Sequence, residues 1–166
     1  MAKIYCFISD EPFLLQENRL IEINKLKKEG YLNRKIFFVD KKFNWNTFDS
    51  NNSLSLFEDK ELLDIRINGF APTKDCLNYL EDFSGKEESS KTVILSIENV
   101  TKVKGSAWFK KISSITKSSY IEKIYPNQFP AWLESRAKRR GLNLDVQMTD
   151  YLTELTHGYL YAADQE

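Results

Sequence analysis

The sequence contains few of the residues that build metal centres, disulfide scaffolds or membrane spans. Its 166 residues include two cysteines and one histidine, too few for a disulfide framework or a zinc ligand set. No apolar run approaches the roughly 20 residues that a transmembrane helix needs, and Ser9, Asp10 and Glu11 interrupt the first apolar stretch, which argues against a signal peptide. These absences predict a soluble, cytoplasmic protein with buried free thiols at Cys6 and Cys76, no metal site, no cofactor and no membrane contact.

An excess of charge of one sign is also missing. The 24 lysines and arginines equal the 24 aspartates and glutamates, whereas proteins that coat nucleic acid carry surplus positive charge. Local basic patches leave a DNA-binding module open as an alternative, although cations in the last turn of a helix also suit its dipole. The candidate DNA or partner contacts are Arg136, Lys138, Arg139 and Arg140, and a second candidate patch comprises Lys102, Lys104, Lys110 and Lys111.

Short apolar strands alternate with helical patterns over most of the chain. This alternation predicts a three-layer α/β domain with a mostly parallel sheet. The most hydrophobic strand, 92–97, is expected at the centre of the sheet and the last one at an edge. The expected strands are 4–8, 35–39, 62–67, 92–97 and 120–125, and the expected helices are 12–29, 43–48, 75–83 and 106–115.

The pattern changes after Pro126. Two helices, 130–140 and 145–156, follow each other without a strand, and 159–163 resembles the start of a third. We therefore expect a first domain over 1–142 and the beginning of a helical domain over 143–166. The chain is expected to be a fragment of a longer protein.

The chemistry-bearing motifs of α/β enzymes are absent. A phosphate site at the first strand-to-helix turn needs glycines and a lysine, but this turn reads Ser9-Asp10-Glu11-Pro12 and carries two carboxylates. Gly85-Lys86 lacks the upstream glycine of that motif, and no nucleophile stands with a base. The sequence predicts a protein that is not an enzyme, with a degenerate NTPase as a third interpretation.

An unusual segment, 51–60, combines asparagines and serines with adjacent apolar residues, Leu56 and Phe57. Polar residues of this kind predict a loop or a frayed helix end. One interpretation is that the apolar pair tucks under the sheet edge, and the other is that it forms a hydrophobic plug for a partner's pocket. A leucine or phenylalanine buried at an interface contributes roughly 1.5–3 kcal/mol, so two neighbours could anchor a modest interface.

Taken in order, these motifs resemble the delta subunit of the bacterial DNA polymerase III clamp loader, and the resemblance spans essentially the whole chain. The residues that carry it are Glu11 to Glu17 after the first strand, Ser55-Leu56-Phe57, the set Lys104, Ser106, Trp108 and Phe109, and the junction containing Pro130, Trp132, Arg136-Ala137-Lys138 and Gly141 to Asp145.

The resemblance implies an AAA+-like first domain without a functional P-loop, followed by the start of a helical lid domain. It implies that the chain binds the sliding clamp, the beta subunit, and helps to open the ring during DNA replication. Leu56 and Phe57 would enter the hydrophobic cleft of the clamp, with Ser53, Leu54 and Ser55 shaping the segment. Other clamp-loader subunits would bind through a C-terminal collar that this sequence lacks, with DNA held within the assembly.

Overall fold

The computed structural model describes residues 3–50, 60–86 and 90–166. It divides the chain into two compact units, Met1–Ile121 and Glu122–Glu166, which are described separately. No helix among the described residues is long and apolar enough to cross a membrane.

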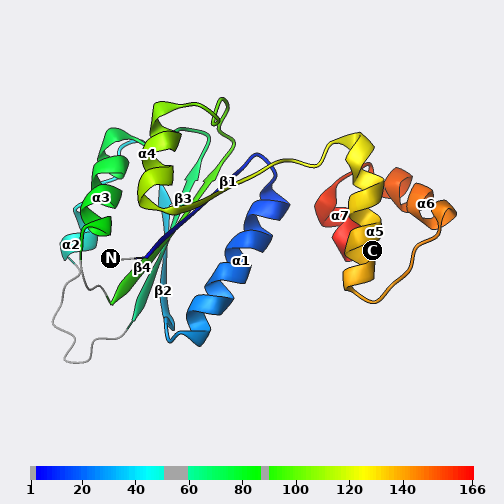
Figure 1. The fold of residues 1–166 in the computed structure, drawn as a ribbon, viewed down its shortest axis with the longest axis horizontal. Coiled ribbons are helices and arrows are strands. Elements are labelled where there is room, and N and C mark those ends of the chain that lie inside the picture. The colour runs from blue at the N-terminus through cyan, green and yellow to red at the C-terminus, as the bar shows by residue number, and fades with distance from the viewer. Residues whose placement is uncertain (1–2, 51–59, 87–89) are drawn as a thin grey trace. The chain divides into compact units, whose positions relative to one another are not determined.

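The first unit is a five-stranded sheet in which strands and helices alternate (Figure 1). The strand order is β2-β3-β4-β1-β5, and every strand pairing is parallel. The predicted α/β class and parallel sheet are confirmed. The elements are β1 (Ile4–Ser9), α1 (Pro12–Lys28), β2 (Asn33–Val39), α2 (Thr47–Ser50), β3 (Glu61–Asn68), α3 (Lys74–Ser84), β4 (Lys91–Glu98), α4 (Ala107–Ile115) and β5 (Lys117–Ile121).

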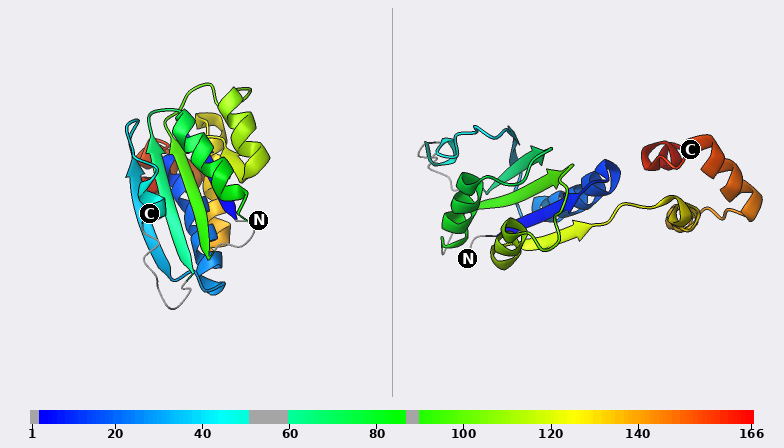
Figure 2. Two further views of the ribbon diagram at one scale, coloured as in Figure 1. Left: turned by 90° about the vertical axis from the view of Figure 1, so that its left-hand side faces the viewer. Right: turned by 90° about the horizontal axis from the view of Figure 1, so that it is seen from above.

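The direction of each crossover decides which face of the sheet its helix covers. The chain passes from β1 to β2 in one direction across the sheet and returns through β3, β4 and β5 in the other. Because parallel crossovers are right-handed, α1 lies on one face and α3 and α4 lie on the other (Figure 2). We call these the α1 face and the α3 face.

Each face has its own hydrophobic core. The larger core, on the α3 face, joins strand residues such as Cys6, Ile65 and Leu95 to Cys76 and Leu80 of α3. On the α1 face, Leu15, Ile23 and Leu26 pack against the sheet in a smaller cluster. The strand predicted to be central, β4, does lie between β3 and β1, and its residues 92–97 are all buried.

The two thiols are buried as predicted. Cys6 and Cys76 are both free and inaccessible. Burial raises the pKa of the Cys76 thiol to about 12 and raises the pKa of Cys6 as well, since an apolar core disfavours the thiolate. Both side chains therefore act as small apolar groups of the core.

Two elements differ from the sequence predictions in their limits. Over 40–46 the chain forms turns instead of a helix, because the side chains of Asp40 and Asn44 accept the backbone N–H groups of Lys42 and Asn46 at 2.8 and 3.1 Å, which competes with helix formation. The last strand is β5, 117–121, and not 120–125, because Thr116 ends α4 directly before it and the pairing with β1 begins there.

The second unit contains η1 (Pro126–Gln128), α5 (Phe129–Arg139), α6 (Val146–Thr156) and α7 (Leu160–Gln165). The structure divides the chain between Ile121 and Glu122, earlier than the expected boundary near residue 142. The expected boundary followed the end of the first helix after Pro126 and therefore left α5 in the first domain. Its apolar side chains Phe129 and Leu133 are buried within this unit, as is Leu160 of α7.

The α1 face also holds a buried carboxylate. Asp64 in the middle of β3 is fully buried, and its Oδ2 atom accepts hydrogen bonds from Arg34 Nη2 at 2.5 Å and from Arg66 Nη2 at 3.0 Å. A buried charge is tolerated when it is paired in this way, and removal of one partner leaves an uncompensated charge. Asp64 therefore holds the side chains of both arginines on the α1 face of the sheet.

We predict that Asp64→Asn lowers the free energy of unfolding by about 3 kcal/mol, because two partly buried guanidinium groups lose their counter-charge. Urea unfolding followed by circular dichroism measures the change. The matched control is Asp82→Asn at an exposed position on α3, which should stay within about 0.5 kcal/mol of the unmodified protein. Equal stability of the two variants would show that the buried pair contributes little.

Candidate functional site

The predicted plug residues lie outside the described part of the chain. Ser53, Leu54, Ser55, Leu56 and Phe57 all fall within 51–59, of which the structure gives no description. The described residues on both sides of this segment show how its two ends are held.

The end that precedes the segment is held by an aromatic cluster. Phe48 of α2 is 5% exposed, and its ring centroid lies 4.7 Å from that of Phe37 on β2 and 4.9 Å from that of Tyr79 on α3. Trp45 contacts Tyr79 at 5.3 Å. Each such ring pair contributes about 0.5–1.5 kcal/mol beyond its area burial, so α2 is tied to the α3 face of the sheet.

The end that follows the segment is held by ionic and backbone contacts. Lys60 Nζ donates to the carbonyl of Glu29 at 2.8 Å. The backbone N–H of Glu61 donates to Ser90 O at 2.9 Å. The Glu61 carboxylate pairs with Lys35 at 2.5 Å and with Lys91 at 3.5 Å. The first residues of β3 are therefore fixed by neighbouring strands and by the end of α1.

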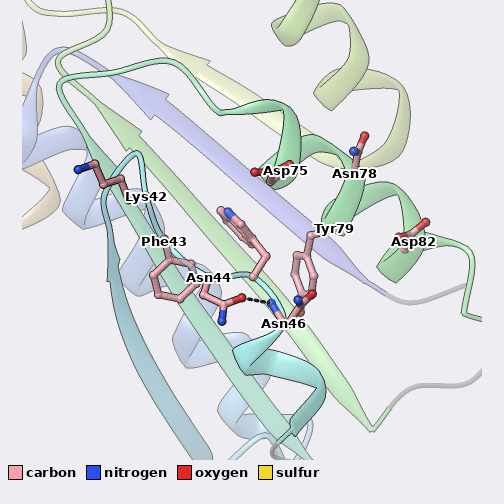
Figure 3. Close-up of a pocket in the computed structure, with 9 residues that line it drawn as sticks. Lys42, Phe43, Asn44, Asn46, Asp75, Asn78, Tyr79 and Asp82 are labelled. Carbon is pink, nitrogen blue, oxygen red and sulfur yellow. Dashed lines mark hydrogen bonds between the residues drawn. The ribbon is translucent and has the colours of Figure 1, made fainter.

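A cleft of about 520 Å³ lies beside α2, between the turn residues and α3 (Figure 3). Its rim carries the carboxylates of Asp75 and Asp82 and the ammonium of Lys42, and Trp45 and Tyr79 line its apolar wall. Within the described residues no group of three or more acidic, histidine or cysteine side chains could hold a metal ion. The cleft offers two separate carboxylates and no ligand set.

In the first strand-to-helix turn, the side chains of Ser9 and Glu11 accept hydrogen bonds from the backbone N–H groups. Ser9 Oγ donates to Ile121 O at 2.8 Å and accepts the N–H of Glu11 at 3.0 Å. The Glu11 carboxylate accepts the N–H of Phe13 at 3.2 Å, and Pro12 has no N–H to offer. In nucleotide-binding folds these donors hold phosphate, whereas here a carboxylate occupies one of them and repels an anion.

The basic residues near the end of α5 are partly neutralised within their own unit. Arg136 Nε bonds Asp164 Oδ1 at 2.5 Å, and Arg140 Nη2 bonds the same oxygen at 2.6 Å. Lys138 and Arg139 are exposed. Half of the predicted DNA-contacting set is thus committed to holding α7 against α5.

The second predicted basic patch also has local partners. Lys111 pairs with Glu81 of α3 at 2.7 Å, and Lys104 lies over the ring of Tyr120 at 5.1 Å. Lys102 and Lys110 are exposed. These contacts are typical of a solvated helical surface.

Sequence reasoning missed one charged cluster. Asp64 was assigned to a buried strand, but its pairing with Arg34 and Arg66 was not predicted, nor was the approach of Arg19 from α1. The available signal was the charged pair Asp64 and Arg66, two residues apart in a strand that is otherwise mostly apolar, since a buried carboxylate requires a partner. The partner on β2 could be found only once the strand order was known.

Comparison with known proteins finds similarity to DNA polymerase III subunit delta and to a clamp loader delta protein. No protein-family model matches the chain. Over 163 residues the sequence is 23% identical to DNA polymerase III subunit delta of Escherichia coli (strain K12). The matched region covers 97% of this chain and 48% of the relative. A solved structure, the Bacillus subtilis DNA clamp loader delta protein (YqeN), matches with a TM-score of 0.64 at 13% identity and covers 99% of this chain and 51% of that one.

The fold is that of the clamp loader delta proteins, with an α/β unit followed by helices. The resemblance to the delta subunit of DNA polymerase III, which the ordered motifs indicated, is confirmed by both comparisons. The chain spans about half the length of the two relatives that it matches.

We predict that adenosine triphosphate with magnesium does not raise the Tm of the protein, because the Glu11 carboxylate accepts the Phe13 N–H at the start of α1 and would repel a phosphate there. Differential scanning fluorimetry measures the shift. A ligand at 100 times its Kd stabilises a protein by about 2.7 kcal/mol, which such a scan detects. A rise in Tm that saturates with nucleotide would contradict this prediction and restore the degenerate NTPase interpretation.

Proposed function

We propose that this chain is a delta-type clamp-loader subunit that binds a replicative sliding clamp through Leu56 and Phe57 and helps to open the ring. The observation that carries the proposal is the similarity to subunit delta along 97% of the chain, which includes the adjacent apolar pair of segment 51–59. Ser53, Leu54 and Ser55 are proposed to shape the same segment.

The held ends of the segment support this role. A binding loop loses conformational entropy when it docks, and a scaffold that restrains its ends reduces that cost. Phe48 restrains the chain before the segment, and Glu61 restrains it afterwards. Loops positioned by a rigid scaffold are the usual place for binding residues.

Ring opening by this route needs no bond chemistry. A subunit that binds the open or strained ring more tightly than the closed ring shifts the equilibrium by the difference between the two affinities. Two buried apolar side chains supply roughly 3–6 kcal/mol of transfer free energy at about 1.5–3 kcal/mol each. The closed turn at Ser9 to Phe13 agrees with a role that uses protein contacts and no nucleotide.

The proposal includes the partners of a clamp loader. The chain would act with other loader subunits, joined through a collar region, and near the DNA that the assembly handles. Bacterial replication takes place in the cytoplasm, which is therefore the proposed location. The basic residues of α5, among them the exposed Lys138 and Arg139, are the proposed contacts with DNA or a neighbouring subunit.

We predict that the double variant Leu56→Ala with Phe57→Ala weakens clamp binding by more than about 2 kcal/mol, because both anchors are removed. Isothermal titration calorimetry with the cognate sliding clamp measures the Kd. The matched control is Leu142→Ala with Tyr151→Ala, an equally apolar pair exposed in the second unit, which should leave the Kd unchanged. Unchanged affinity in the Leu56 and Phe57 variant would refute the plug assignment.

A second prediction concerns the anchor before the segment. Phe48→Ala should weaken clamp binding severalfold although Phe48 is buried, because α2 loses its contacts with Phe37 and Tyr79. Ile23→Ala in the core of the α1 face is the control for lost stability. Calorimetry at a temperature where both variants are folded should show weaker binding for Phe48→Ala alone. Equal affinities for the two variants would exclude an anchoring role.

A further inference from the structure

Part of the α1 face of the sheet carries exposed apolar side chains that no helix among the described residues of this unit covers. Over the edge strand β2, Ile36 is 45% exposed and Phe38 is 75% exposed. Leu20 of α1 is 39% exposed. The register aligns Ile36 with Asp64 and Phe38 with Arg66 on β3, so the apolar side chains flank the buried ionic cluster.

The ionic cluster has more positive than negative charge. Arg19, Arg34 and Arg66 surround the single carboxylate of Asp64, and Glu98 at the end of β4 is the further acidic neighbour of Arg19. Two of the arginines bond Asp64 directly.

The third arginine retains an unused donor. Arg19 Nε is buried and has no hydrogen-bond partner among the described residues. Burial, with the neighbouring Arg66 as a smaller cause, lowers the pKa of the Arg19 guanidinium from its ordinary value. A buried donor of this kind is costly when its hydrogen bond is not made, and a carboxylate held beside the guanidinium group would compensate the positive charge of Arg19.

We propose that the edge strand β2 and the arginine cluster beside it form a docking site for an extended acidic peptide segment of a partner protein. The segment adds to the free edge of β2, places an apolar side chain against Ile36 and Phe38, and directs a carboxylate toward Arg19 and Arg66.

The geometry of strands supports this mode of binding. Among the described residues β2 pairs with β3 on one side only and ends the sheet (Figure 2), which leaves its outer edge for strand addition. Added strands lie about 4.8 Å away, and their alternate side chains point to the same face at about 6.6 Å intervals. Ile36 and Phe38 are two residues apart on one face, and the added strand repeats that spacing.

Charge favours an acidic partner. Arg34 and Lys35 of β2 are paired with Asp64 and Glu61. Lys41 and Lys42 follow the strand, with Asp40 as the one acidic residue between 33 and 42. Phe38 is already stacked beneath Arg66, whose guanidinium carbon lies 5.1 Å from the ring centroid. The aromatic ring and the arginine therefore present an apolar and a cationic group side by side.

A peptide fits this surface better than a nucleic acid. The side chains of Arg34 and Arg66 are 22% and 23% exposed, so they offer one small cationic spot beside apolar side chains and not an extended row of accessible cations. Phosphate-driven binding relies on accessible lysines and arginines, whereas apolar and aromatic groups with a buried charge are typical of protein interfaces.

The test uses the full chain and a defined probe. The probe is a ten-residue fluorescein-labelled peptide in which glutamate alternates with leucine and valine, and its counterpart carries lysine in place of every glutamate. Fluorescence anisotropy measures the Kd, and ¹H–¹⁵N correlation spectra locate the contact. We expect the acidic peptide to bind at least about tenfold more tightly than the basic one and to shift the amide signals of 33–39 and the Nε–H signal of Arg19.

Two pairs of variants separate the apolar and ionic contributions. Phe38→Ala should weaken peptide binding about tenfold, and its control is Ile21→Ala, which removes an apolar side chain that is 50% exposed on α1. Arg19→Met should also weaken binding and leaves the pairs of Asp64 intact. Its control, Lys28→Met, removes one exposed charge from the last turn of the same helix.

The proposal fails if the two peptides bind equally, if the shifted signals lie outside β2 and α1, or if Phe38→Ala and Arg19→Met retain full affinity. It also fails if the acidic peptide causes no shift at millimolar concentration. The result is independent of clamp binding, because Leu56→Ala with Phe57→Ala should bind the peptide as the unmodified chain does.

Discussion

The right-handed crossover of parallel strands is the constraint on which this molecule depends. The sheet order β2-β3-β4-β1-β5 requires one crossover in one direction and three in the other, so handedness assigns α1 to one face and the later helices to the opposite one. On the α3 face the hydrophobic core includes Phe48 and Trp45, and these two side chains hold α2 against the sheet. On the α1 face no helix among the described residues of this unit covers β2. The aromatic attachment of α2 and the exposed surface of β2 both follow from this asymmetry.

The asymmetry also places the α2 anchor of the proposed clamp-binding segment and the arginine cluster on opposite faces of the sheet. The segment proposed to bind a clamp follows α2, which aromatic contacts hold on the α3 face. The other end of the segment is held by ionic and backbone contacts of Lys60 and Glu61. The arginine cluster lies on the other face, where a buried carboxylate fixes the guanidinium groups. Rigid attachment lowers the entropy lost on docking in both cases. Neither surface requires a nucleotide, and the first strand-to-helix turn is occupied by the Glu11 carboxylate.

Much of the fold could be predicted from sequence because its signals are local. Apolar runs such as Val93 to Leu95 and the start of α1 at Pro12 are readable without a partner strand, and both are confirmed. The arginine cluster was missed because Arg34 meets Asp64 only through the strand order. The limits of β5 were missed because its pairing with β1 and the end of α4 decide them. The plug assignment depends on resemblance and remains a prediction.

The most direct test of the central claim replaces Phe57 by the photo-crosslinking residue p-benzoylphenylalanine and irradiates the full chain with the cognate sliding clamp. The same replacement at Tyr125, which is 50% exposed, serves as the reference. We expect a covalent adduct from position 57, mapped by mass spectrometry to an apolar cleft of the clamp, and none from position 125. Absence of an adduct at position 57, or equal yields from both positions, would contradict the account.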